Sequence, residues 1–320
     1  MNPIGTTQLY CLLGNPVSHS VSPAMHNASF DAHGLDASYM AFKVENADFS
    51  DAVEGLKALG CAGFNLTMPF KTAIIPFLDE IDEIAKLSNS VNTCIYKDGR
   101  LKGYTTDGIG FLESMKESGI SYTGTTITIL GCGGAATSII TQAAMEGVNK
   151  INILKRKNGS FQQTVDYAAR ITKSTNCEVY VYDISNLTIL EFCIQESDIL
   201  INSTNVGMGD DDSSLVPPSF FHPNLIVCDV IYHPAETRLL REARLAGCKT
   251  MNGKYMLLYQ GAAAFKIWTG LDMPVAMVKE KYFDNQPETK QNKETRKNNE
   301  LHILEENAYT RRNQRDATCS

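Results

Sequence analysis

Residues 127–137 read Ile-Thr-Ile-Leu-Gly-Cys-Gly-Gly-Ala-Ala-Thr, a short apolar run followed by a glycine-rich turn and then by helix-forming residues. This is the order that a strand, a phosphate-binding turn and a helix N-terminus require. Gly131 allows the tight turn, Gly133 lets the backbone approach a pyrophosphate, and the small Ala136 allows the helix to pack closely on the strand. The stretch therefore predicts a dinucleotide-binding turn, although a glycine-rich turn can also be a plain connector.

The residues around this turn favour the nucleotide interpretation. Strand-like runs occur at 150–154 and 179–182, and residues 136–146, between the turn and the first of these runs, are compatible with a helix. Alternation of strands and helices at this spacing is typical of a parallel α/β sheet. We therefore expect an α/β domain that binds a dinucleotide.

Composition and charge limit the class of protein. The chain has 320 residues, of which 43% are hydrophobic, and this length is enough for about two globular domains. The formal net charge of −7 gives no support to nucleic-acid binding. The sequence has no apolar run of about 18 residues and no apolar segment at its N-terminus, so we expect neither a membrane span nor a secretory signal.

The nine cysteines are scattered along the chain, and they form no C-x-x-C pair. This pattern argues against a zinc site and against a disulfide framework. Most of the cysteines lie in apolar runs, so buried and reduced thiols are expected. We expect no bound metal and a cytoplasmic location.

A loop rich in hydroxyl groups follows the first predicted strand. Residues 14–27 read Gly-Asn-Pro-Val-Ser-His-Ser-Val-Ser-Pro-Ala-Met-His-Asn and run into a helix. Such a loop presents several donors and acceptors from a rigid scaffold. Ser22 before Pro23 is also a good helix start without any ligand, and we expect Ser22 to cap the helix while Ser20 points outward.

Two charged residues stand at the polar ends of predicted strands in the first third of the chain. Lys71 follows Pro69, which fixes the turn, and Asp107 lies where a strand passes into a helix. Taken singly, each has an ordinary explanation, as a solvated loop lysine and as a helix cap. As a pair, the carboxylate would orient the lysine, hold its charge and accept hydrogen bonds from a hydroxylated ligand.

A basic run follows the predicted strand at 150–154. Lys155, Arg156 and Lys157 precede Asn158, at the place where an NAD-preferring domain usually carries Asp or Glu for the adenosine ribose. Cations at this place suit a 2′-phosphate, and the alternative is an ordinary solvated loop.

Three further segments bear on function or organisation. Residues 203–209 form a polar loop after a predicted strand, which is where α/β sheets place ligands. Gln260 lies in an apolar helical stretch and needs a hydrogen-bond partner if it is buried, which a ligand could provide. Residues 285–320 are rich in polar and charged residues, so a disordered tail is expected.

Together these motifs resemble the shikimate dehydrogenase family, and most closely its quinate/shikimate dehydrogenase branch. The resemblance covers residues 8–283. It includes the serine-bearing loop, the segment of the catalytic lysine, the hydroxyl-binding segments, the cofactor turn, the nicotinamide side and the closing helix. The matching segments are 14–23, 65–71, 91–93, 106–108, 131–135, 202–208 with Gly253, and 256–261.

The resemblance implies a two-domain α/β fold, with a Rossmann-type dinucleotide-binding domain and a smaller α/β substrate-binding domain. Residues 1–106 with 254–284 would form the substrate-binding domain, and residues 107–253 the dinucleotide-binding domain. Lys71 and Asp107 would be catalytic. The implied substrate-binding residues are Ser20, Ser22, Thr67, Asn92 and Gln260, and the cofactor-binding residues are Gly131, Gly133, Gly134, Ala135, Lys155, Arg156, Asn158, Thr204, Tyr232 and Gly253.

The implied activity is the reversible oxidation of shikimate, or of quinate, to the 3-dehydro ketone with NADP or NAD, in aromatic amino acid biosynthesis. Lys71 would move the hydroxyl proton or stabilise the alkoxide, and Asp107 would orient Lys71 and a substrate hydroxyl. A homodimer is one option for the assembly. The alternatives are a dehydrogenase of the same fold for another hydroxy acid, and a non-catalytic nucleotide sensor. A sensor has no need of a proton-transfer lysine, so the Lys71 and Asp107 pair argues against it.

The chain departs from the family pattern at a few positions. Thr105 stands where asparagine is usual, and Cys132 replaces a small alanine. Asn89 replaces a glycine, and asparagine tolerates the left-handed backbone that the turn needs. Asn158 falls near a ribose-binding aspartate of the quinate/shikimate branch. Because no carboxylate is left there to repel a 2′-phosphate, we expect use of both cofactors, with NADP favoured modestly.

Overall fold

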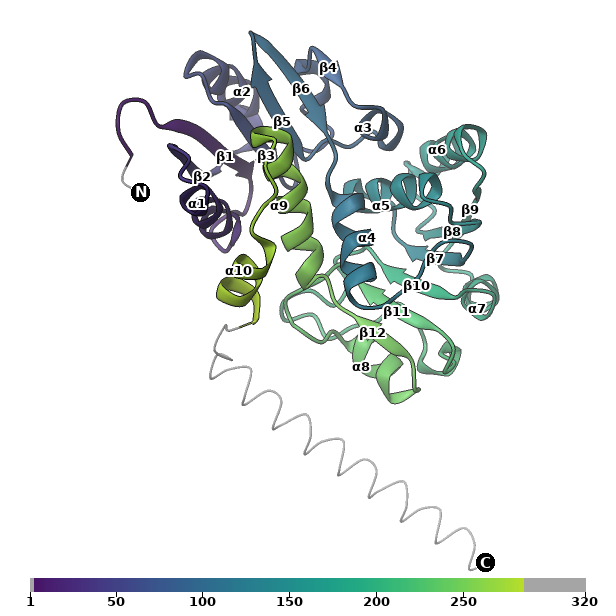
Figure 1. Cartoon of the computed structure of the whole chain (residues 1–320). Helices are drawn as coiled ribbons and strands as arrows, with labels where there is room; N and C mark the ends of the chain where they lie inside the picture. The colour runs from purple at the N-terminus through teal and green to yellow at the C-terminus, as the bar shows by residue number, and fades with distance from the viewer. Residues whose placement is uncertain (1–2, 285–320) are drawn as a thin grey trace, which may run out of the picture. The chain divides into compact units, whose positions relative to one another are not determined.

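The structure, a computed structural model, describes residues 3–284 (Figure 1). It contains two separate six-stranded sheets, each with helices packed on it. The predicted two-domain α/β fold class is confirmed. The tail predicted at 285–320 lies outside the described residues.

The first sheet is mixed, with the strand order β2-β1-β3-β5-β6-β4. β1 pairs in parallel with β2 and β3, as the alternation of strands and helices indicates, whereas β5 pairs antiparallel with β3 and β6. Its strands are β1 (Gln8–Gly14), β2 (Ala37–Lys43), β3 (Gly63–Leu66), β4 (Glu80–Ile81), β5 (Thr93–Lys97) and β6 (Arg100–Tyr104).

The second sheet is entirely parallel, with the strand order β12-β11-β10-β7-β8-β9. Counted from its own first strand this is 6-5-4-1-2-3, the Rossmann arrangement, and the order reverses at β7. The glycine-rich turn therefore lies at the switch point, where such sheets bind ligands. The strands are β7 (Thr126–Leu130), β8 (Lys150–Lys155), β9 (Glu178–Asp183), β10 (Ile199–Asn202), β11 (Ile226–Asp229) and β12 (Lys249–Met251).

Helices α4 and α9 run side by side between the two sheets (Figure 1). The α-helices of the described residues are α1 (Ser22–Ala32), α2 (Phe49–Ala58), α3 (Glu83–Ser88), α4 (Asp107–Glu117), α5 (Gly134–Met145), α6 (Phe161–Ser174), α7 (Leu187–Gln195), α8 (Arg238–Leu245), α9 (Lys254–Thr269) and α10 (Val275–Lys279). After α10, the described chain ends in a π-helical turn, Glu280–Asp284. Among residues 3–284, no helix has the length and apolar character needed to cross a membrane.

Alternate side chains of the second sheet enter two different cores. Ile199 and Ile201 pack on one face with residues of α4, α5 and α6, whereas Leu200 packs on the other face with residues of α7 and α8. This alternation follows from the two-residue period of a strand. A third core, which includes Phe64 and Phe70, lies on the first sheet.

His26 of α1 is fully buried among aromatic rings. Its ring stacks on that of Tyr39, with 4.6 Å between centroids, and lies 5.1 Å from the ring of Trp268. Neither ring nitrogen has a hydrogen-bond partner. Because burial disfavours the charged imidazolium, it lowers the pKa of His26 to about 3.

We expect this histidine to make the fold sensitive to acid. Below its unfolded pKa of about 6.5, the unfolded chain takes up a proton that the folded chain takes up only near pH 3. The contribution of the neutral His26 to the free energy of unfolding is therefore complete above pH 6.5 and is lost as the pH falls toward 3, by about 5 kcal/mol in all. Urea titrations between pH 7 and pH 4 should show this loss in the wild type and a smaller loss in His26→Phe. The exposed His19→Gln should behave as the wild type, and an identical loss in His26→Phe would contradict the prediction.

Candidate functional site

Lys71 and Asp107 are brought together by the fold. Lys71 follows β3 in a turn, and Asp107 is the first residue of α4. The Lys71 Nζ donates to the Asp107 Oδ2 at 2.5 Å, and their side chains are 18% and 7% exposed. Thr106, and not Asp107, is the N-cap residue of α4. The Asp107 carboxylate therefore pairs with Lys71 instead of serving as the cap of α4.

Asn92 holds the other oxygen of this carboxylate. Its Nδ2 donates to the Asp107 Oδ1 at 2.9 Å, and it also lies 3.3 Å from the Gln260 Oε1 on α9. The Asn92 Oδ1 accepts from the Thr106 N–H at 2.7 Å. Asn92 and Gln260, two of the predicted substrate-binding residues, are thus buried beside the Lys71–Asp107 pair, and each has partners within the protein.

The serine-bearing loop adjoins the turn that carries Lys71. The Asn15 N–H donates to the Met68 carbonyl at 3.0 Å, next to the predicted substrate residue Thr67. The prediction that Ser22 caps α1 is wrong, because the N-cap is Val21 and it makes no side-chain bond. Instead, the Ser20 Oγ accepts from the Ser22 N–H at 3.2 Å. The hydroxyl of Ser20 thus pairs with the N–H of Ser22, the first residue of α1.

The glycine-rich turn leads directly into α5. Gly131 has a φ of +93°, a left-handed conformation that favours glycine, and its N–H donates to the Leu154 carbonyl. Gly133 is the N-cap of α5, where no side chain bonds the first N–H groups. A Cβ at Gly133 would meet no atom within 4 Å. The turn thus offers unpaired donors and open space to a phosphate.

The same turn lies against Lys71, the catalytic candidate that follows β3 of the first sheet. A Cβ built at Gly134 would lie 3.3 Å from the Lys71 Cδ and 3.0 Å from the Ser90 Oγ. Ser90 is fully buried, and its hydroxyl has no hydrogen-bond partner. Gly134 is therefore the point at which the start of α5 packs on Lys71.

The basic run after β8 is only partly available to a ligand. Arg156 and Asn158 are exposed, and the Asn158 Oδ1 accepts from the Ser160 N–H and Oγ. Lys155 is buried, and its Nζ donates to the Ser160 Oγ at 2.7 Å and to the Thr164 Oγ1 at 3.2 Å. Two hydroxyls at the start of α6 therefore hold the Lys155 Nζ, and the role of Lys155 in cofactor binding stays a prediction.

Three residues predicted to bind the cofactor, two of them on the nicotinamide side, lie beyond β10, β11 and β12. The Thr204 Oγ1 donates to the Asn202 Oδ1 at 2.7 Å, and Tyr232 is exposed. Gly253 is buried, and a Cβ there would lie 2.0 Å from the Val230 carbonyl oxygen. The absence of a side chain at Gly253 is thus required by packing of the chain on itself.

Asp229 is a buried charged residue that the sequence analysis did not select. It ends β11 and accepts hydrogen bonds from Asn202, Ile231 and Thr237. The signal in the sequence is a single carboxylate at the end of an apolar strand, on the edge of the sheet where ligands bind.

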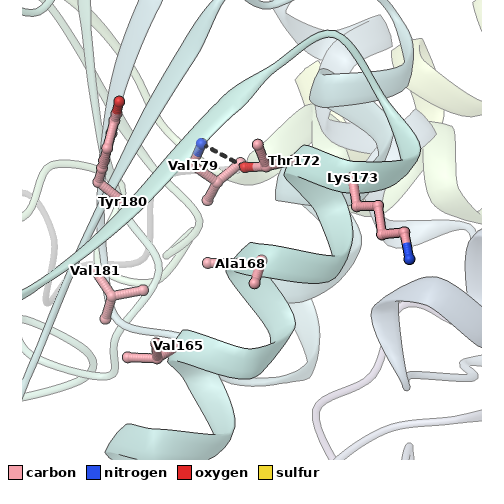
Figure 2. A pocket seen from close by; sticks show the side chains of 8 residues that line it. Val165, Ala168, Thr172, Lys173, Val179, Tyr180 and Val181 are labelled. Carbon is pink, nitrogen blue, oxygen red and sulfur yellow. Dashed lines mark hydrogen bonds between the residues drawn. The ribbon is translucent and has the colours of Figure 1, made fainter.

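Figure 2 shows an apolar groove elsewhere, between α6 and β9. Val165 and Ala168 line it from α6, and Val179 and Val181 line it from β9. No predicted site residue lines this groove. Within residues 3–284, no group of His, Cys, Asp or Glu side chains could hold a metal ion. The eight described cysteines are free thiols, and all except Cys132 are buried.

Three features define the class of this protein as a dinucleotide-dependent oxidoreductase. They are the parallel sheet in the Rossmann order, the glycine turn at its switch point, and the lysine–aspartate pair that lies against that turn. Family models agree with this class. Residues 12–94 match the shikimate dehydrogenase substrate binding domain, and residues 255–281 match the shikimate 5′-dehydrogenase C-terminal domain.

The chain belongs to the shikimate dehydrogenase family. It is 44% identical over 277 residues to the shikimate dehydrogenase (NADP(+)) of Alkaliphilus metalliredigens, which covers 86% of this chain and 96% of that protein. The crystal structure of shikimate 5-dehydrogenase from Listeria monocytogenes with shikimate and NAD is 42% identical, with a TM-score of 0.83 over 88% of this chain and 98% of that one. Quinate dehydrogenase from Corynebacterium glutamicum with NAD is 29% identical, with a TM-score of 0.77 over 86% of this chain and 98% of that one.

Proposed function

We propose that this chain catalyses the reversible oxidation of shikimate to its 3-dehydro ketone with NADP or NAD. The observation that carries the proposal is the Lys71–Asp107 pair, whose lysine stem packs on Gly134 at the start of α5. A proton-transfer group is thereby placed beside the turn that binds the cofactor phosphates. The named relatives at 42–44% identity act on shikimate, which supports this substrate.

Within this proposal, the neutral amine of Lys71 takes the proton of the reacting hydroxyl during oxidation and becomes an ammonium, which returns the proton in the reverse direction. Asp107 keeps the Lys71 amino group aimed at that hydroxyl, since its Oδ2 holds the Lys71 Nζ. The Asn92 Nδ2 donates to the other carboxylate oxygen, the Asp107 Oδ1, and so fixes the carboxylate. Ser20, Ser22, Thr67 and Gln260 complete the substrate side by resemblance to the family.

The residues of the turn suit a dinucleotide. Gly133, Gly134 and Ala135 lie at the start of α5, and Gly133 has the free space that a pyrophosphate needs beside the backbone. When bound, the nicotinamide supplies the hydride chemistry. Arg156 and Lys157 are exposed after β8, and of these two cations we assign Arg156 to a 2′-phosphate.

The division into domains is also a proposal, with residues 1–106 and 254–284 on the substrate side and residues 107–253 on the cofactor side. It is supported by the two separate sheets and by the family models. The cytoplasmic location is supported by the buried free thiols. The homodimer and the quinate activity stay predictions.

Initial rates with shikimate and with quinate, each with NADP and with NAD, test the proposed function directly. We expect turnover of shikimate with both cofactors. Absence of turnover with shikimate, together with activity on another hydroxy acid, would favour the alternative dehydrogenase. Binding of the cofactor without turnover of any polyol would favour a sensor.

Cofactor preference should depend on Arg156 and Asn158, two of the exposed polar residues that follow β8. A guanidinium attracts the 2′-phosphate, whereas a carboxylate repels it and accepts from a 2′-hydroxyl. We therefore expect Arg156→Ala to raise the KM for NADP by roughly tenfold and that for NAD much less. Asn158→Asp should shift the preference toward NAD. If the wild type uses NAD alone, the basic run is a solvated loop.

Gly134 and Gly133 should respond differently to an added methyl group. In Gly134→Ala, the Cβ presses on the Lys71 Cδ at 3.3 Å, so we expect a roughly tenfold fall in kcat from displacement of the lysine. In Gly133→Ala, the Cβ meets no protein atom but obstructs the approach of the pyrophosphate, so the KM for NADP should rise. Steady-state kinetics of both variants separate these effects, and equal changes in both would contradict the assignment.

A further inference from the structure

Two segments that follow neighbouring strands are held together by a single buried carboxylate. Asn202 and Asp229 face each other in the register of β10 and β11, and they are 2% and 0% exposed. The Asn202 Nδ2 donates to the Asp229 Oδ1 at 3.1 Å. This link lies at the carboxyl ends of the strands, where the sheet binds its ligand.

From Asn202 the hydrogen bonds continue into the loop after β10. The Asn202 Oδ1 accepts from the Thr204 N–H at 3.1 Å and from its Oγ1 at 2.7 Å, and the Asn202 Nδ2 also donates to the Val206 carbonyl. The Thr204 Oγ1 in turn accepts from the Val206 N–H. The backbone of residues 203–206 is therefore fixed from one side chain, which is itself fixed by Asp229.

From Asp229 the hydrogen bonds also reach the turn after β11. The Asp229 Oδ1 accepts from the Ile231 N–H at 3.0 Å, and this fixes the backbone beside the exposed Tyr232. The Ile231 carbonyl accepts from the Gly253 N–H at 2.9 Å. The resemblance assigns three residues of these segments to the cofactor, Thr204, Tyr232 and Gly253. The segments that carry them are thus all connected to Asp229 by hydrogen bonds.

The second oxygen of the carboxylate serves a different element. The Asp229 Oδ2 accepts from the Thr237 Oγ1 at 2.8 Å, and Thr237 caps α8. Burial raises the pKa of Asp229 to about 6, and the hydrogen bonds from Ile231, Thr237 and Asn202 oppose that rise. A buried carboxylate with three donors is costly to assemble and strongly directional, so it fixes its neighbours in one arrangement.

We propose that Asp229 is a positioning residue that sets the place of the nicotinamide half of the cofactor, by fixing the loop after β10 and the turn after β11 through its Oδ1. The inference rests on the proposed function, since it takes these two segments as the nicotinamide side. It leaves the adenosine half, at the end of β8, outside the influence of Asp229.

The test compares two substitutions that differ in hydrogen bonding. In Asp229→Asn, the amide oxygen can still accept from Asn202 and Ile231, while the amide nitrogen donates to the Thr237 hydroxyl. In Asp229→Leu, a side chain of similar volume accepts no hydrogen bond. Thr237→Val is the matched control, because it removes the Oδ2 contact and leaves the two Oδ1 contacts in place.

Two probes are titrated into each full-length variant, NADPH and adenosine 2′,5′-bisphosphate, which carries the adenosine half alone. We expect Asp229→Leu to bind NADPH roughly tenfold more weakly, as for the loss of one or two hydrogen bonds to a charged acceptor, with less than about a twofold change for the bisphosphate. Asp229→Asn should restore most of the NADPH affinity. Thr237→Val should lower the Tm without changing the ratio of the two affinities.

Equal weakening of both probes in Asp229→Leu would show a general structural role and overturn the proposal, as would wild-type NADPH affinity in that variant. If Asp229→Asn loses as much NADPH affinity as Asp229→Leu, positioning by hydrogen-bond acceptance is excluded. Should Asp229→Leu fail to fold, Asn202→Ala must give the same selective loss for the proposal to stand. The binding readout separates this inference from the proposed function, which fails only if the wild type does not oxidise shikimate.

Discussion

Lys71→Ala is expected to lower kcat for shikimate oxidation by about 10²–10⁴-fold, the usual contribution of a positioned acid or base. The amine of Lys71 is the group of the pair that is assigned to accept the proton of the reacting hydroxyl, since both oxygens of Asp107 already accept from Lys71 and Asn92. The KM for shikimate should change little, because the predicted substrate-binding side chains stay in place. Steady-state kinetics at saturating NADP measure both quantities.

A matched variant separates the charge of Lys71 from its packing. Lys71→Met keeps a chain of similar length against Gly134 but has no ammonium, so it should be as inactive as Lys71→Ala. Recovery of turnover in Lys71→Met would show that Lys71 contributes to turnover only through the packing of its stem on α5, and not through its amino group. Near wild-type turnover in both variants would remove Lys71 from the catalytic assignment.

The local features of the site could be predicted from the sequence because they depend on neighbouring residues. A glycine turn between a strand and a helix requires a particular backbone, and Gly131 adopts the expected left-handed φ. Asn89, which replaces a glycine of the family pattern, also adopts a left-handed conformation, with φ of 51°. The approach of Lys71 to Asp107 was predicted from their similar positions at strand ends.

Contacts with side chains from distant or unexpected positions could not be predicted in this way. Lys155 looks like a free cation in the sequence, but Ser160 and Thr164 of the next helix hold it inside. Serine is a common helix cap, so Ser22 is a candidate, yet the hydroxyl that accepts from an N–H at the start of α1 belongs to Ser20. Asp229 acquires its role only when β10 and β11 pair and bring Asn202 opposite it. Such roles depend on register and on side-chain reach, which local patterns do not contain.

Asp107→Asn is expected to lower kcat/KM for shikimate by roughly 10²–10³-fold, through both constants. The two oxygens of Asp107 have different donors, the Lys71 Nζ and the Asn92 Nδ2. An amide has a single oxygen, so either its NH₂ group faces the ammonium or it faces the Asn92 amide, and one hydrogen bond is replaced by a contact between two donors. In the first case Lys71 loses its orientation and kcat falls. In the second case Asn92 is displaced, and its contact with Gln260 on α9 is disturbed, so the KM for shikimate rises.

The appropriate control is Glu113→Gln, which neutralises a partly exposed carboxylate on the same helix that pairs with the surface lysine Lys116. It should leave kcat and KM unchanged, because a surface ion pair contributes little and neither Glu113 nor Lys116 is assigned to the site. Thermal unfolding of Asp107→Asn should show whether α4 stays folded. If kcat and KM are both unchanged in a folded Asp107→Asn, the carboxylate is only an acidic residue that favours the start of α4. If kcat falls while the KM for shikimate is constant, Asp107 acts through Lys71 alone, and the contact with Asn92 serves only to hold the carboxylate in place.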